Sequence, residues 1–320
     1  MKLGVLTVPL YSMDLKSCLA YLKGLGVQSV ELGCGGNPGT GHCDAKELLS
    51  DRTKLSEFKQ IIAESGLEIS AFSAHGNGVH PDPEVARKDT EDLENAICLA
   101  QEMGVGVVNT FSGCPGDSEG SRYPNWVTCA WPEDYLKVLD YQWNEKLLPY
   151  WHKEGKFAES HGVKVAFEMH PGFCVYNTET MRRINREIGS SVGANFDPSH
   201  LVWQGMDPVA AIRELTGIIY NVHAKDCRVD TLNTGKIGVL DTKHYSDERH
   251  RAWIFRTVGY GHNSQYWRDI VSELRLAGFD GSMAIEHEDS LMSVREGLEK
   301  AVAFMRDVLI FESAAEMWWA

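Results

Sequence analysis

Four strand-like runs in the second half of the chain end on residues that can bind a metal ion. In chain order these residues are Glu168, Asp197, His223 and Glu286. One carboxylate at a strand end has an ordinary explanation, since acidic residues often cap helices or open turns. Three carboxylates and an imidazole gathered at one place would raise one another's pKa values unless a cation lay between them. This donor set suits Mn2+, Mg2+, Co2+ or Fe2+ better than a thiolate-binding metal, so the pattern predicts one divalent-metal site.

Short apolar runs alternate with amphipathic stretches along the whole chain. The strand-like runs are 3–8, 29–33, 68–76, 105–113, 164–172, 192–197, 218–226 and 282–289. The helical stretches are 14–25, 53–65, 83–103, 133–161, 178–188, 207–215, 264–277 and 292–311. Eight alternating repeats favour an α/β fold closed as a (β/α)8 barrel, also called a TIM barrel. No GxGxxG motif follows the first strand, which argues against an open Rossmann-type sheet, and no linker divides the chain, so we expect one domain over 1–320.

In such a barrel the active site lies at the carboxyl ends of the strands, where this sequence places further polar residues. Candidates for substrate binding there are His75, Asn109, His170, His200 and Lys225. For His200 we consider an additional or outer ligand, a substrate hydrogen bond, and a helix-start histidine that faces solvent. For His170 we consider a proton donor and a purely structural hydrogen bond.

Two long loops, at 113–131 and 227–263, are expected to act as lids or interface elements. In the second loop, Arg256 with Trp253 and Phe255 could cover a substrate. The alternative is that Arg256 makes a surface salt bridge while the aromatic residues pack the loop.

The composition is that of a globular protein, with 43% hydrophobic and 24% charged residues among 320. A formal net charge of -14 without any basic run argues against nucleic-acid and membrane partners. The eight cysteines form no CxxC pair, and the amino terminus lacks a signal peptide, so we expect free thiols and a cytoplasmic protein. The glycine-rich run 34–41 lacks the Lys-Ser/Thr end of a phosphate loop and is interpreted as a loop after the second strand. The tail, 312–320, ends in a tryptophan pair that would favour subunit contact if it is exposed.

The chain resembles the xylose isomerase-like TIM-barrel superfamily over roughly residues 1–310, through the motifs VAFEMHPG, NFDPSHLVWQG, NVHAKD and MAIEHED. This superfamily includes ketose 3-epimerases, inosose-pathway enzymes and AP endonuclease IV. The resemblance implies that Glu168, Asp197, His223 and Glu286 hold one divalent metal, most often Mn2+, with Zn2+ also open. It implies that Glu168 and Glu286 are the acid/base pair, and that Lys225 or Arg228 contacts a substrate oxygen. The acidic chain lacks most of the extra ligands of AP endonuclease IV, which argues against DNA repair. The long 227–263 segment resembles a branch linked to keto-glycosides and cyclitols.

The resemblance implies proton transfer next to a carbonyl through a metal-stabilised enediolate. Our main hypothesis is therefore a sugar isomerase or epimerase that acts on a keto-sugar or related polyol. One alternative is a lyase, a hydratase or a C-glycoside deglycosidase subunit that acts on 3-keto-glycosides at the same site. A second alternative is a non-catalytic metal-binding barrel. A small sugar is the expected ligand, and a homo-oligomer, with a second small subunit also open, is the expected assembly.

Overall fold

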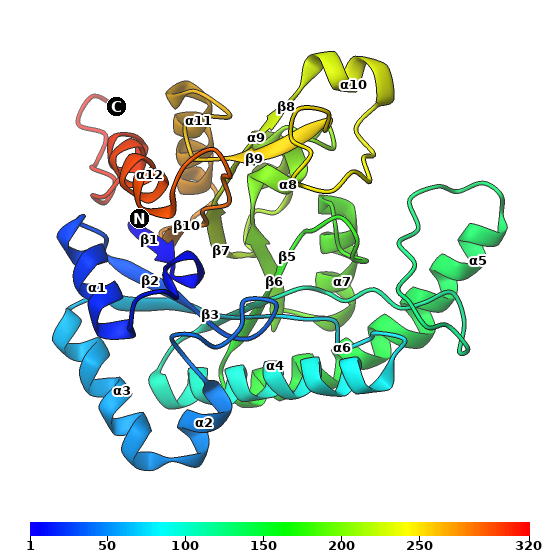
Figure 1. Cartoon of the computed structure of the whole chain (residues 1–320), viewed down its shortest axis with the longest axis horizontal. Coiled ribbons are helices and arrows are strands. Elements are labelled where there is room, and N and C mark those ends of the chain that lie inside the picture. Colours follow the sequence, from blue (N-terminus) through cyan, green and yellow to red (C-terminus); the bar gives the residue numbers. More distant parts are fainter.

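The computed structural model covers residues 1–320, and its central feature is a closed barrel of eight parallel strands (Figure 1). The barrel order is β1-β10-β7-β6-β5-β4-β3-β2, which confirms the predicted TIM barrel. The barrel strands are β1 (Lys2–Leu6), β2 (Ser29–Gly36), β3 (Glu68–His75), β4 (Val107–Thr110), β5 (Lys164–Glu168), β6 (Val192–Phe196), β7 (Ile219–Ala224) and β10 (Ser282–Ile285). Most of their residues are buried, because helices cover the outside of the barrel while side chains fill its interior.

The helices that surround the barrel begin and end at the residue types that the sequence offers for this purpose. Helix α4 (Pro83–Met103) has the predicted bounds: Asp82 accepts the Glu84 N–H, proline follows it, and Gly104 ends the helix at a φ of 68°. The other helices are α1 (Leu15–Gly24), α2 (Ala45–Ser50), α3 (Arg52–Ser65), α5 (Asp134–Tyr141), α6 (Leu148–Ser160), α7 (Thr178–Ile188), α8 (Pro198–Val202), α9 (Pro208–Glu214), α10 (Thr231–Ile237), α11 (Ser264–Leu276) and α12 (Val294–Val308). None of them has the length and apolar content of a membrane-crossing segment.

Several predicted boundaries were wrong in ways that matter for the site. The runs 164–172 and 282–289 were predicted as strands over their whole length. The strands end at Glu168 and Ile285, so the polar residues that follow belong to loops. The glycine-rich run is partly strand, because β2 extends to Gly36. The predicted helix 133–161 is interrupted by a π-helical turn at Gln142–Leu147, between α5 and α6.

The segment 227–263 is more ordered than a loop. It contains α10 between two short antiparallel strands, β8 (Asp226–Val229) and β9 (Trp253–Arg256), which lie at the top of Figure 1 beyond the barrel strands. The Asp226 carboxylate anchors the return of this segment, since its Oδ2 accepts the backbone N–H groups of Gly259, Gly261 and His262 at 3.0–3.1 Å. We call residues 226–262 the lid.

Strand β6 leads to Asp197, and its packing depends on a glycine. A Cβ on Gly193 would lie 2.5 Å from the carbonyl oxygen of Ile218 and would also meet the ring of Tyr220. We expect Gly193→Ala to lower the free energy of unfolding by about 1–3 kcal/mol, because the overpacked strand must shift. Urea unfolding measures this, with Gly106→Ala as the control, since a Cβ there meets nothing within 4 Å. Equal urea midpoints for the two variants would contradict the prediction.

Candidate metal centre

The four residues predicted as metal ligands meet at the carboxyl end of the barrel. Ligand atoms of Glu168, Asp197, His223 and Glu286 all lie within 4.8 Å of one another. His223 Nδ1 is 3.2 Å from Glu168 Oε2 and 3.0 Å from Glu286 Oε2. The side chains come from the ends of β5, β6, β7 and β10, and all but Glu286 are almost fully buried. The structure thus brings together donors that lie 118 residues apart in sequence.

Asp197 combines the two functions that its position suggested. Its Oδ1 accepts the Ser199 N–H at 2.8 Å and caps the short helix α8. Its Oδ2 is buried and makes no hydrogen bond. One oxygen therefore orients the side chain, and the other is free to bind a cation.

The donors fit a divalent cation. Asp197 Oδ2, Glu286 Oε2 and His200 Nε2 are buried without a hydrogen bond, although buried polar atoms usually have a partner. His200 Nε2 lies 3.0 Å from Glu168 Oε1 and 3.3 Å from Asp197 Oδ2, so several lone-pair donors converge. Three carboxylates and an imidazole suit a hard or borderline divalent ion.

Glu31 on β2 also belongs to the site, although it was not among the residues predicted from the sequence. It is 0% exposed, and its Oε1 accepts a hydrogen bond from His223 Nε2 at 2.8 Å. Asn221 donates to Glu31 Oε2 at 3.0 Å, and the Ser73 hydroxyl donates to Oε1. Glu31 thereby places a proton on Nε2 and leaves Nδ1 to face the ligand carboxylates. The available signal was an acid inside the apolar run SVELG, where burial requires a partner.

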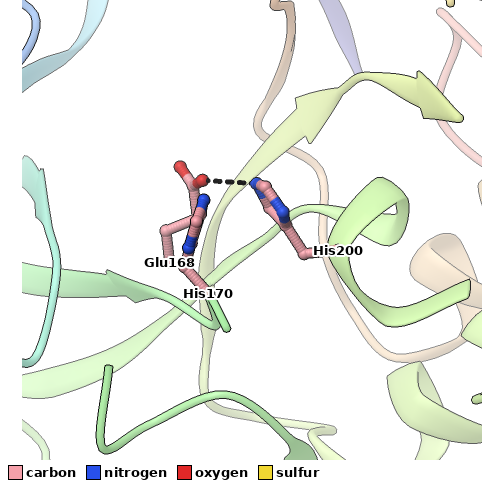
Figure 2. A group of neighbouring side chains, drawn as sticks. All are labelled: Glu168, His170 and His200. Atoms are coloured by element: carbon pink, nitrogen blue, oxygen red, sulfur yellow. Dashed lines mark ion pairs between the residues drawn. The ribbon is translucent and has the colours of Figure 1, made fainter. Parts of the chain in front are cut away.

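A second donor group shares Glu168. Figure 2 shows the Glu168 carboxylate pointing towards His200, with His170 beside it, and ligand atoms of these three residues also lie within 4.8 Å of one another. His200 is 1% exposed, so the interpretation that it faces solvent is wrong. His170 Nδ1 donates to the carbonyl oxygen of Pro171 at 2.6 Å, which supports the structural interpretation and leaves Nε2 without a proton. Burial lowers the pKa of His170 to about 3, so its ring is neutral.

Lys225 is a buried cation at the edge of the ligand set. Its Nζ lies 3.3 Å from Glu286 Oε1, 2.7 Å from Glu288 Oε2 and 4.3 Å from the centre of the Phe255 ring. Burial opposes its charge, but the surrounding carboxylates raise the pKa of Lys225 well above its usual value. Burial likewise opposes the charge of Glu286, yet Lys225 lowers the pKa of Glu286 to about 2.

These residues open onto a cavity of about 670 Å3, which is large enough for a small-molecule substrate. His75, Glu168, His170, Lys225 and Glu286 line it. The lid covers it with Tyr245, Ile254 and Phe255. His75 Nε2 also donates to Glu168 Oε2 at 3.1 Å, which holds that carboxylate towards the cavity.

Besides His200, three predicted substrate contacts are not among the residues that line this cavity. Asn109 is fully buried on β4 and does not line the cavity. Arg228 is an exposed residue of β8 and is also outside it. Arg256 forms ion pairs with Glu248 of the lid at 3.2 Å and with Asp289 beyond β10 at 3.4 Å. It is therefore salt-bridged as in the alternative, but its side chain is only 11% exposed and the pair is not a surface one.

The chain belongs to the xylose isomerase-like TIM barrel family, whose model matches residues 19–308. The protein YfiH of Bacillus subtilis (strain 168) is 34% identical over 312 residues, which cover 97% of this chain and 99% of YfiH. Inosose dehydratase of Mesomycoplasma hyopneumoniae is 26% identical over 227 residues, which cover 69% of this chain and 71% of that protein. The structure of D-psicose 3-epimerase in the presence of D-fructose matches with a TM-score of 0.63 at 13% identity, over 97% of this chain and 99% of that chain. The relatives in sequence thus include a dehydratase, and the likeness to the epimerase structure at this identity shows the fold alone.

Glu31 is expected to control metal affinity without being a ligand. Glu31→Gln keeps the shape of the side chain but removes the charge that orients His223, so we expect Mn2+ affinity to fall about 10–100-fold. Isothermal titration measures this. Glu154→Gln is the matched control, because Glu154 is also 0% exposed but lies on α6 with Lys153 as its partner. Unchanged affinity in Glu31→Gln would contradict the assigned role.

Metal affinity is also expected to rise with pH. Burial opposes the charge of His223, but Glu31 and the ligand carboxylates raise its pKa well above the usual value, so it is protonated in the metal-free protein at neutral pH. A cation must displace that proton, which weakens binding by up to about tenfold for each pH unit below the His223 pKa. Burial raises the pKa of Asp197 to about 6, so the dependence steepens below that pH. Mn2+ titrations between about pH 5 and pH 8 test this, and a flat profile would refute it.

Proposed function

We propose that this protein is a divalent-metal-dependent sugar isomerase or epimerase that acts on a keto-sugar or related polyol. The observation that carries the proposal is the position of two carboxylates, Glu168 and Glu286, which line the cavity and belong to the candidate ligand set. Reactions that invert or move a hydroxyl next to a carbonyl need two groups that exchange protons with carbon. The similarity in sequence to inosose dehydratase supports this substrate class, whereas the D-psicose 3-epimerase structure shares the fold alone.

We propose Mn2+ as the cation, held by Glu168, Asp197, His223 and Glu286, with Mg2+, Co2+, Fe2+ and Zn2+ as the other candidates. Such a cation would polarise a substrate carbonyl and stabilise the negative charge of an enediolate. The chain's own residues would perform the proton transfers.

The two glutamates have different surroundings, which suits different tasks. Lys225 keeps Glu286 ionised, so Glu286 can take a proton from the carbon next to the carbonyl. Glu168 receives a hydrogen bond from His75, and this imidazole can replace a proton that Glu168 gives to carbon. His170, neutral and partly buried in the cavity wall, would accept a hydrogen bond from a substrate hydroxyl through Nε2.

Elimination of water is the second candidate, and similarity to inosose dehydratase favours it. It shares the first step, the loss of a proton next to a carbonyl. It then needs a group that stabilises the departing hydroxyl, and Lys225 is a buried cation that lines the cavity and can donate a hydrogen bond to it. Lyase, hydratase or deglycosidase activity on 3-keto-glycosides would use the same residues.

The test is proton exchange followed by NMR in D2O. Metal-loaded protein is mixed with a panel of ketohexoses, inososes and 3-keto-glucosides. We expect deuterium uptake next to the carbonyl, its loss with chelator, and a product that identifies epimer, isomer or eliminated sugar. Glu168→Gln is expected to slow exchange by about 10^2–10^4-fold, which is typical of general acid–base catalysis.

Two outcomes would overturn parts of the proposal. If the Mn2+-loaded protein exchanges protons with none of these compounds, the result would favour the second alternative, a barrel that binds metal without catalysis. Full exchange by a Glu168→Gln variant that retains metal would refute the acid/base assignment. Glu154→Gln controls for the loss of a buried carboxylate away from the cavity.

We also propose a homo-oligomer in a reducing, cytoplasmic compartment, with a small sugar as the ligand. The eight cysteines are all free, which supports the compartment. Trp318 and Trp319 at the carboxyl terminus are 88% and 68% exposed, which supports a subunit contact there.

A further inference from the structure

A second compartment adjoins the cavity that contains the candidate metal site. It has a volume of about 400 Å3, and His170 and Tyr245 line both spaces. His200, which contacts Glu168 in Figure 2, lines the second compartment. Its aromatic walls are Trp126, Trp203, Tyr245 and Trp253. Because the two spaces share wall residues, a ligand bound at the metal site could extend past His170 into the second space. We call this second space the ring compartment.

The walls of the ring compartment are held in place by the lid. The Arg251 guanidinium, which is almost fully buried, stacks on Tyr245 at 4.2 Å and on Trp253 at 4.7 Å. Trp253 Nε1 donates to the carbonyl oxygen of Val239 at 3.1 Å. Asp241 accepts the Ala252 N–H at 2.7 Å and the Lys243 N–H at 3.0 Å. The lid is therefore pre-organised, and its aromatic side chains do not need ordering by a ligand.

The chemistry of these walls favours an apolar ring over a sugar or a charged group. Trp203 and Trp253 stack on each other at 4.4 Å and 6°, and Leu240 adds an aliphatic side chain at the edge. The one carboxylate there, Asp241, uses its oxygens within the lid. Flat aromatic walls of this kind pack well against the face of an aromatic ring.

The volume of the compartment agrees with a substituted ring. Cavities on the order of 150 Å3 accept benzene, so about 400 Å3 accommodates a six-membered ring with substituents.

We propose that the substrate has two parts: a polyhydroxylated carbonyl part at the metal site, and an apolar ring bound in the ring compartment between His170 and the lid. This proposal rests on the proposed function for the first part only. It makes the lid the determinant of substrate class.

The test compares two probes that differ only in the substituent, methyl and phenyl 3-keto-β-glucoside, in calorimetric titrations of the Mn2+-loaded protein. We expect the phenyl compound to bind at least about tenfold more tightly, because burial of the ring removes apolar surface from water. A third probe with a glucosyl substituent distinguishes a saccharide-binding compartment. Equal affinities for methyl and phenyl, or the tightest binding for glucosyl, would overturn the proposal.

Variants of lid residues test whether the phenyl ring binds in the ring compartment. Leu240→Asp places a charge at the compartment edge, and Thr242→Trp fills the space from an exposed position. Both should reduce the affinity for the phenyl compound to that of the methyl compound and leave the latter unchanged. Leu232→Asp is the matched control, since Leu232 is 76% exposed on α10 and lies outside the compartment. A phenyl preference that survives both variants would refute this location.

Phenol alone separates this proposal from the proposed function. Saturation-transfer NMR of phenol is recorded with metal-loaded and chelator-treated protein, and with Thr242→Trp. Binding that persists without metal and disappears in the variant supports the ring compartment even if no keto-sugar binds. Absence of phenol binding together with absence of a phenyl preference refutes it, whatever the catalytic result.

Discussion

The carboxylates of Glu168, Asp197 and Glu286 lie so close together that their mutual repulsion determines how the barrel mouth is built. Their ligand atoms lie within 4.8 Å of one another, and burial removes much of the water that would screen them. Two buried cations oppose this charge: His223 contacts Glu168 and Glu286, and Lys225 contacts Glu286. Even with these cations nearby, Asp197 Oδ2 has no hydrogen bond. A divalent ion would complete the neutralisation, which is why these donors are better explained by a cation than by capping.

The same constraint extends into the barrel interior. Asn221 and His223 are two residues apart on β7, so both point inwards and both reach Glu31. Asn195 stands two residues before Asp197 and donates to Glu168 Oε2 at 3.3 Å. The polar layer beneath the mouth therefore orients the ligands, and it explains why amides occupy strand positions that are otherwise apolar.

The lid supplies the aromatic side chains that cover the cavity, which the barrel strands do not provide. Relatives with the same fold include an epimerase and a dehydratase, so the fold does not decide the reaction. In this chain the lid brings Phe255 and Tyr245 over the cavity and walls the ring compartment with Trp253. We infer that substrate choice depends on residues 226–262, whereas proton transfer depends on the strand ends.

The sequence by itself determined the barrel and the four candidate ligands. Strand and helix alternation is a local property, and the polar residues at strand ends are visible because they interrupt apolar runs. Only the tertiary structure brought in Glu31, because its partner His223 is 192 residues away. It also decided that Arg256 is paired within the lid and that Arg228 is exposed, since a long segment between strands carries no period that fixes where its side chains point. The two roles of Asp197, helix cap and candidate metal ligand, could both be inferred from the sequence. Only the folded chain, by directing one oxygen to Ser199 and the other into the mouth, combined them.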